Sequence, residues 1–199
     1  MMTRTKAGVI LSMIAVLVIT VAVVAAESPT GSSNDANLTG VSVSISGGFK
    51  TDPRDNGRPV VLIASMLGVT PDVFREAFSG VTPSKNGPPS GEQAQANKQA
   101  LLKVLAPYGV TNEKLDEVSN YYRYKASLGE TWPQTQATAS AKVVDGKIVI
   151  TITQAGAGYT SVPKVVIRQG NITYQGIATV AYTTDFKSNG SISAIVIQK

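Results

Sequence analysis

The chain has 199 residues, of which 43% are apolar and 16% are charged, so it can bury one or two ordinary hydrophobic cores. The formal net charge is +5, and basic residues alternate with acidic ones, as in Lys114-Leu-Asp-Glu117. This pattern is typical of a solvated surface and argues against nucleic acid as a partner. The sequence has no His and no Cys, which excludes a Ser-His-Asp triad, a cysteine nucleophile, an ordinary zinc site and any disulfide.

Residues 1–26 have the pattern of a secretory signal peptide. Arg4 and Lys6 precede an unbroken apolar run that ends in Val24-Ala25-Ala26, and small residues at these positions are typical of a cleavage site. A retained membrane anchor is the alternative, because about 20 helical residues span the ~30 Å hydrocarbon core of a bilayer. We expect cleavage after Ala26 and a secreted or periplasmic protein, whereas a retained segment would anchor the chain by a transmembrane helix.

A linker and a strand follow the signal segment. Residues 27–40 are rich in Ser, Gly and Asn and are interpreted as a flexible linker. Residues 41–46, with the sequence VSVSIS, alternate apolar and polar side chains. That period of two predicts a half-buried strand.

Residues 51–58, with the sequence TDPRDNGR, are predicted to form a charged turn, because Asp, Pro, Asn and Gly favour turns. We expect Asp52 and Asp55 to form ion pairs with Arg54 and Arg58. A calcium loop is an alternative, since oxygen ligands lie next to a glycine. The stretch lacks the spacing and the distal Glu of calcium loops, and two arginines would repel the ion. We therefore expect no metal site.

Residues 59–126 show helical periodicity, and the sequence Gly-Val-Thr occurs in them twice. Gly68 and Gly109 are predicted to end a helix, because glycine accepts the left-handed conformation, and the threonine two residues later is predicted to cap the next helix. The sequence therefore predicts four helices arranged as two αα-hairpins. They belong to a mainly helical domain, residues 41–133, that begins with the strand.

From residue 134 the apolar period becomes two, which indicates a small antiparallel β-domain, residues 134–199. Residues 137–153 and 178–197 align as two copies of a β-hairpin, the first turning at Asp145-Gly146 and the second at Asn189-Gly190. The predicted fold class is α+β, with a small four-helix domain followed by a β-repeat domain.

Between the two hairpins lies the stretch AGAGYTSVPKVVI, residues 155–167. Gly156 and Gly158 permit positive φ in a tight corner, and Pro163 suits the start of a strand. Tyr159 is predicted to be buried and to fill the space that this corner leaves. A ligand-binding loop with an exposed Tyr159 is the alternative interpretation.

Two resemblances rest on these stretches. Residues 136–199 resemble the Gly-Ser-Gly-Tyr-Thr-Ser-Ala-Pro type of β-repeat of bacterial cell-surface and phage-tail-like proteins, with matches at Gly156, Gly158, Tyr159, Ser161, Pro163 and Val165. The resemblance implies a repeated β-module in an exported protein and names no ligand. Residues 47–133 resemble a group of uncharacterised exported bacterial proteins, through residues 52–55, 57–64 and 73–81. This second resemblance implies no activity.

Aromatic residues beside the domain boundary are the candidate binding residues. Tyr121 and Tyr124 lie near the edge of the last apolar helical stripe, and Trp132 follows soon after, so they could stack on a sugar or hold a partner. The alternative is that they seal the helical domain against the β-domain, and their position favours it. Glu130, next to this cluster, is a candidate carboxylate for glycoside chemistry, which needs two carboxyl groups about 5 to 9.5 Å apart.

We expect an exported, non-enzymatic binding or scaffolding protein of the bacterial envelope or extracellular space, with an envelope protein or a polysaccharide as its partner and no cofactor. The alternative is a carbohydrate-active enzyme or lectin that uses Glu130, Trp132 and the neighbouring tyrosines. Contact with a membrane is expected only if the N-terminal segment is retained.

Overall fold

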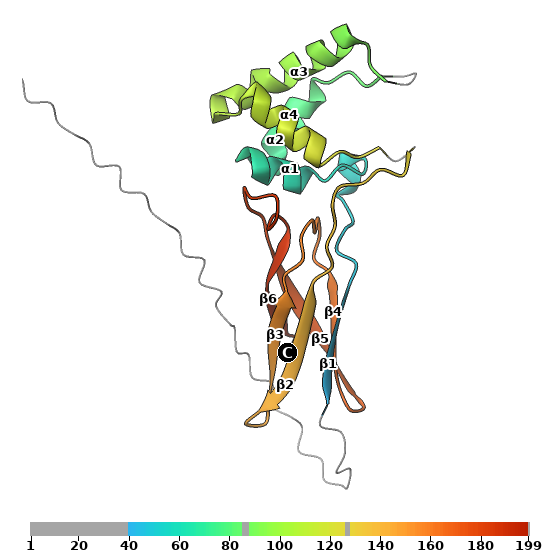
Figure 1. Cartoon of the computed structure of the whole chain (residues 1–199), viewed down its shortest axis with the longest axis vertical. Coiled ribbons are helices and arrows are strands. Elements are labelled where there is room, and N and C mark those ends of the chain that lie inside the picture. Colours follow the sequence, from blue (N-terminus) through green and yellow to red (C-terminus); the bar gives the residue numbers. More distant parts are fainter. Residues whose placement is uncertain (1–39, 85–87, 126–127, 199) are drawn as a thin grey trace, which may run out of the picture.

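The computed structural model describes residues 40–84, 88–125 and 128–198, so the predicted signal peptide and nearly all of the predicted linker lie outside the described residues. Helices occupy one end of the elongated molecule and strands the other (Figure 1). This arrangement confirms an α+β fold with a four-helix part and a β-part. None of the helices in the described ranges is long and apolar enough to cross a membrane.

The helical part is organised around its first helix. The helices are α1 (Val60–Leu67), α2 (Pro71–Ser79), α3 (Gly91–Leu105) and α4 (Asn112–Tyr121). Six of the eight residues of α1 are buried, because α2 and α4 both pack against it. The helices do not form two separate αα-hairpins, since α3 packs mainly on α2. Its link to α4 is an ion pair of 2.8 Å between Lys98 and Asp116.

Both Gly-Val-Thr turns have the conformation that the sequence predicts. Gly68 (φ +72°) and Gly109 (φ +82°) are left-handed caps, the second after a 3₁₀ turn, Ala106–Tyr108. The hydroxyl of Thr70 accepts a hydrogen bond from the backbone N–H of Val73, and that of Thr111 accepts one from Lys114. Each threonine thereby satisfies an N–H that has no partner within its helix.

Gly109→Val tests the role of this backbone conformation. A Cβ added at Gly109 would meet no atom within 4 Å, so the expected loss, about 1 kcal/mol or more of unfolding free energy, comes from left-handed strain alone. Gly109→Asn is the matched control and should lose less, because asparagine tolerates this region better. Urea unfolding followed by circular dichroism measures both. Equal stability of wild type and Gly109→Val would contradict the assignment.

The β-part contains a four-stranded sheet and a separate hairpin. The sheet has the order β1 (Val41–Ser46), β4 (Lys164–Gln169), β5 (Ile172–Ala181), β6 (Ser191–Ile197), and all its pairs are antiparallel. Strands β2 (Thr138–Val144) and β3 (Lys147–Gln154) form the hairpin, which turns at Asp145 (φ +50°) and Gly146 (φ +73°). Both predicted hairpins are therefore present, but residues 182–190 connect the second one, and Asn189-Gly190 ends this connection instead of forming the turn alone. Strand β5 begins before the predicted second copy, and its hairpin with β4 was not predicted.

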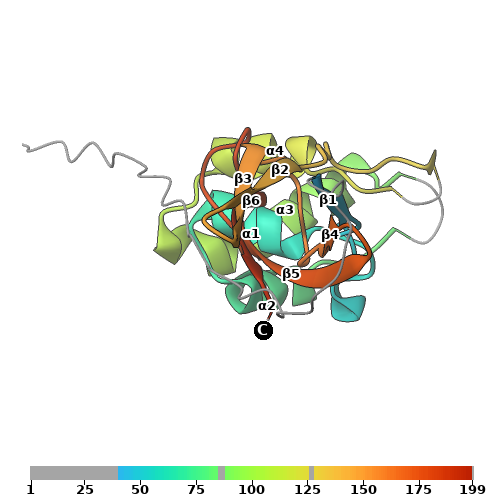
Figure 2. The same ribbon diagram turned by 90° about the horizontal axis from the view of Figure 1, so that it is seen from below.

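Strand β1 lies in the β-part, although the sequence places it at the start of the helical domain. It pairs with β4 along its whole length, from Val41 opposite Gln169 to Ser46 opposite Lys164. Its apolar residues pack on the core of the β-part, together with β2 and β3. Residues that flank the β2–β3 hairpin bond to both edge strands of the sheet. The Gln136 side chain donates to the carbonyl of Ile45 in β1, and the N–H of Ile192 in β6 donates to the carbonyl of Ala155. The strands thus surround one core (Figure 2). The range 41–133 is not one unit in space.

Tyr159 occupies the corner between β3 and β4 and is fully buried, at 0% exposure. Its ring stacks on Phe49 at 4.6 Å between centroids, and its hydroxyl accepts a hydrogen bond of 2.8 Å from the N–H of Ala137. Gly48 and Gly156 lie against the ring, so closely that an added Cβ would come within 2.5 Å and 2.9 Å of its carbon atoms. The corner is therefore packed around the tyrosine, which agrees with the structural interpretation of this stretch.

Tyr159→Ala should lower the unfolding free energy by about 3 to 5 kcal/mol, the usual range for emptying a large aromatic site. Tyr159→Phe should lose about 1 to 3 kcal/mol, because it leaves the buried N–H of Ala137 without an acceptor. Tyr108→Ala, at a side chain that is 56% exposed, is the control and should stay within about 0.5 kcal/mol of wild type. Denaturant unfolding of the full chain measures the free energy of each variant. Superimposable curves for Tyr159→Ala and wild type would show that the ring does not stabilise the corner.

The two parts are joined by the fully buried side chain of Asn189, from the connection between β5 and β6. Its Nδ2 donates to the carbonyl of Leu62 and to the hydroxyl of Tyr122, both at 2.9 Å. Its Oδ1 accepts from the hydroxyl of Ser65 at 2.9 Å and from the N–H of Thr183 at 3.1 Å. All four hydrogen-bonding positions of the amide are therefore filled. Burial raises the pKa of Tyr122 to about 12, so its hydroxyl stays protonated at neutral pH.

Asn189→Ala should lower the unfolding free energy by about 2 kcal/mol or more, because it leaves buried groups of both parts unsatisfied. Asn189→Asp should be at least as damaging at neutral pH, since a carboxylate oxygen would face the carbonyl of Leu62. The control is Asn120→Ala, on the exposed side of α4, expected within about 0.5 kcal/mol of wild type. Thermal and urea unfolding measure the series. If Asn189→Ala behaves like Asn120→Ala, this amide does not hold the parts together.

Candidate functional site

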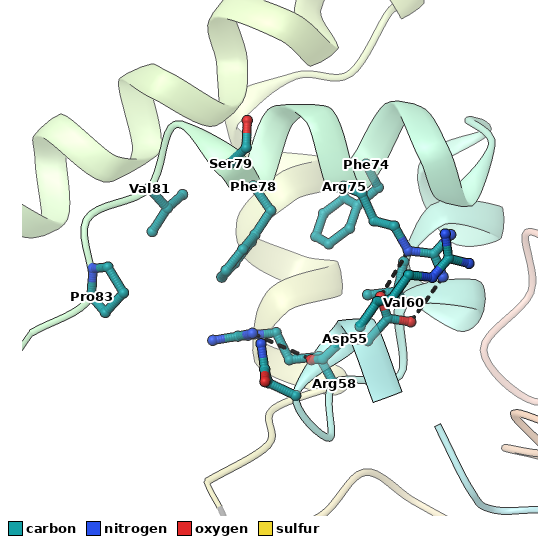
Figure 3. A pocket seen from close by; sticks show the side chains of 11 residues that line it. Asp55, Arg58, Val60, Phe74, Arg75, Phe78, Ser79, Val81 and Pro83 are labelled. Carbon is teal, nitrogen blue, oxygen red and sulfur yellow. Dashed lines mark hydrogen bonds and ion pairs between the residues drawn. The ribbon is translucent and has the colours of Figure 1, made fainter. Parts of the chain in front are cut away.

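The charged turn that precedes α1 builds part of a polar concave surface. Asp52 caps a short 3₁₀ turn, Pro53–Asp55, because its carboxylate accepts from the N–H of Arg54 at 2.9 Å. Asn56 (φ +49°) and Gly57 (φ +85°) then reverse the chain, and α1 begins at Val60. The reversal brings Asp55 and Arg58 beneath α2 (Figure 3).

Arg75 of α2 holds the carboxylates of this turn. Its guanidinium donates to both carboxylate oxygens of Asp55, at 2.8 Å and 3.0 Å, and to Asp72 at 2.8 Å. Asp55 is only 5% exposed, so the bidentate pair compensates a charge that would be costly to bury alone. These hydrogen bonds raise the pKa of Arg75. Hydrogen bonds from Arg54 lower the pKa of Asp52 to about 2. Asp52 therefore stays ionised at neutral pH and cannot serve as a general acid there.

Arg58 differs from its neighbours because no carboxylate in the part of the chain that the structure describes pairs with it. Its guanidinium lies 4.2 Å from the centre of the Phe78 ring, and its Nη1 donates to the backbone carbonyl of Asp55 at 3.3 Å. Among the described residues no Asp or Glu forms an ion pair with it. Burial lowers the pKa of this half-buried guanidinium, because desolvation disfavours the charged form. The guanidinium is still charged at neutral pH and has N–H donors to spare.

A groove of about 380 Å³ opens in front of Arg58. We call it the Arg58 groove. Its lining includes three guanidinium groups, the carboxylate of Asp55 and five apolar side chains: Arg54, Arg58, Arg75, Val60, Phe74, Phe78, Val81 and Pro83. In Figure 3, Val81 and Pro83 lie at one end and Asp55, Val60 and Arg75 at the other. A second hollow of about 430 Å³ shares Asp55, Arg58 and Arg75 with it and adds Lys50, Asp52, Thr160 and Ser161. The surface around Arg58 is thus suited to an anionic group that is attached to an apolar one.

The three aromatic residues that the sequence singles out do not form one exposed platform. Trp132 is 4% exposed, and its Nε1 donates to the carbonyl of Gly158 at 2.8 Å. Tyr124 is half-buried against Trp132, with 6.4 Å between ring centres. Tyr121 packs on a different residue, Phe186, at 4.3 Å. These contacts join the helical part to the β-part, as the sealing interpretation expects.

A shallow depression of about 420 Å³ remains beside Tyr124 and Trp132, and Lys50 and Gln134 also line it. Glu130 is exposed and does not line this depression. Its backbone carbonyl accepts from the N–H of Lys125. The residues of the proposed glycoside chemistry are therefore only partly brought together.

Sequence reasoning did not find the Arg58 groove. It paired Asp52 with Arg54, which the structure confirms at 2.7 Å, but Asp55 pairs with Arg75 and not with Arg58. The spacing of Asp72 and Arg75, three residues apart in the sequence, is typical of an intrahelical pair and carries no sign of the contact with Asp55. Comparison of the chain with known protein families, with curated proteins and with solved structures gives no match to any of them.

Proposed function

We propose that the protein is an exported, non-enzymatic binding or scaffolding protein of the bacterial envelope or extracellular space. The observation that carries this proposal is the Arg58 groove, which combines an apolar wall with a cation that has no ion-pair partner among the described residues. Perturbed ionisable groups in a concave site are candidates for function.

Binding is a better account of this groove than catalysis. The carboxylate that lines it, Asp55, makes a bidentate pair with Arg75, and Asp52 nearby is held in its ionised form. A general acid or base needs a pKa near the working pH and freedom to exchange a proton with substrate. The pKa of an arginine lies far above the working pH, so arginine is not a general acid or base here. Its guanidinium binds carboxylates and phosphates well. Export rests on the sequence of residues 1–26.

Fractionation of the native cells, followed by N-terminal sequencing of the protein, tests the export. We expect the protein outside the cytoplasm with Glu27 as its first residue, because Val24-Ala25-Ala26 forms a signal-peptidase site. Recovery of a membrane-bound form that keeps Arg4 and Lys6 would indicate an anchor instead. A protein found only in the cytoplasm would overturn the proposal.

A lectin or carbohydrate-active enzyme is the second candidate function, and the depression beside Tyr124 and Trp132 is the observation that favours it. A glycan array combined with a turnover assay on cell-wall polysaccharides separates the candidates. Turnover would identify an enzyme and contradict the first proposal. Glycan binding without turnover that is lost in Tyr124→Ala and kept in Tyr108→Ala would identify a polysaccharide as the partner of a binding protein.

A further inference from the structure

We propose that the Arg58 groove binds an acidic peptide segment, in which a carboxylate pairs with Arg58 and a neighbouring apolar side chain packs on the wall that Phe78, Val81 and Pro83 form. The inference deepens the proposed function, on which it rests, by naming the chemistry of the partner. It identifies a protein, and not a polysaccharide, as that partner.

Arg58 is the guanidinium of the groove that lacks a carboxylate partner among the described residues. Arg54 pairs with Asp52, and Arg75 pairs with Asp55 and Asp72. Arg58 is half-buried, yet its hydrogen-bond acceptor among the described residues is a neutral carbonyl. A guanidinium has five N–H donors, so most of those of Arg58 are available. A partly desolvated cation without a counter-ion gains more from an incoming carboxylate than an exposed cation does.

The apolar wall distinguishes a peptide from a sugar. Sugar-binding sites commonly offer an exposed aromatic face for stacking, but the face of Phe78 is covered by Arg58, at 4.2 Å. Val81 and Pro83 instead form an aliphatic border at the end of the groove away from Arg75 (Figure 3). An aliphatic or aromatic side chain next to a carboxylate matches this combination. A volume of about 380 Å³ lies near the lower end of the range of small-molecule pockets, which suits a segment of two or three residues.

The test uses the purified full chain, kept in a non-ionic detergent because of its apolar N-terminal run. The probe is a fluorescein-labelled peptide, Gly-Ser-Asp-Leu-Asp-Ser-Gly, and its binding is measured by fluorescence polarisation. Two matched peptides replace both aspartates by asparagine or the leucine by serine. We expect the parent peptide to bind with a Kd below about 1 mM and both matched peptides to bind about 5-fold or more weakly. Equal binding of the asparagine peptide would overturn the inference.

Arg58→Gln should raise the Kd of the parent peptide about 10-fold or more, because it removes a charged hydrogen bond to a carboxylate. Arg168→Gln makes the same change at an exposed position of β4 and should leave the Kd within about 2-fold. If Arg58→Gln binds the peptide as wild type does, Arg58 is not the binding residue and the inference fails.

Val81→Glu keeps the test decisive if Arg58→Gln does not fold. Val81 is partly exposed at the border of the groove, so a carboxylate placed there should compete with the peptide and raise its Kd about 5-fold or more, whereas Val81→Gln should have a smaller effect. Peptide binding that Val81→Glu leaves unchanged would contradict the inference. The proposed function has its own test: it fails if the protein turns over a polysaccharide or is found only in the cytoplasm. If the protein is exported and shows no turnover but does not bind the peptide, only the present inference fails.

Discussion

Asn189 is the fully buried polar side chain that links the helical part to the β-part, beside the contacts of Trp132 and Tyr121. It reaches from the connection before β6 to the backbone of α1 and the last turn of the helical part, and every one of its polar atoms is engaged. Because α1 is the helix on which α2 and α4 pack, fixing α1 fixes the others. The charged turn that ends at Arg58 leads directly into α1. Asn189, on a distant segment of the chain, thus contacts the helix into which the turn of Arg58 leads.

Tyr159 plays the corresponding role within the β-part. The backbone around it is shared among segments: Thr160 and Ser161 donate to the carbonyl of Gly48, and Gly158 donates to that of Asn189. Pro163 is buried beside it, at the start of β4. Glycines are needed at this corner less for their flexibility than because neighbouring backbone and the tyrosine ring leave no volume for a side chain. Residues 155–167 thus form a tightly packed corner between β3 and β4.

Local signals predicted the elements well, and long-range partners could not be predicted. Caps at Thr70 and Thr111 and the Asp145-Gly146 turn depend on residues within a few positions of each other, so sequence reasoning found them. Asn189 also reads as a turn residue, and nothing local shows that its side chain points into the helical part. The same holds for Asp55, whose partner Arg75 lies on another element. The candidate groove escaped prediction because it depends on which charge remains unpaired after folding.

The pairing of β1 with β4 has a consequence for how the chain acquires its structure. Ser44 and Val166 face each other across this pair although they are 122 residues apart in the sequence. As the chain emerges from a ribosome or an export channel, β1 appears before the helices and must wait for β4 with its hydrogen-bonding edge unprotected. Such non-local pairing slows folding and lengthens the time during which strands can associate wrongly. A chaperone that holds β1 until β4 is available would therefore increase the yield of folded protein more than it would change its final stability.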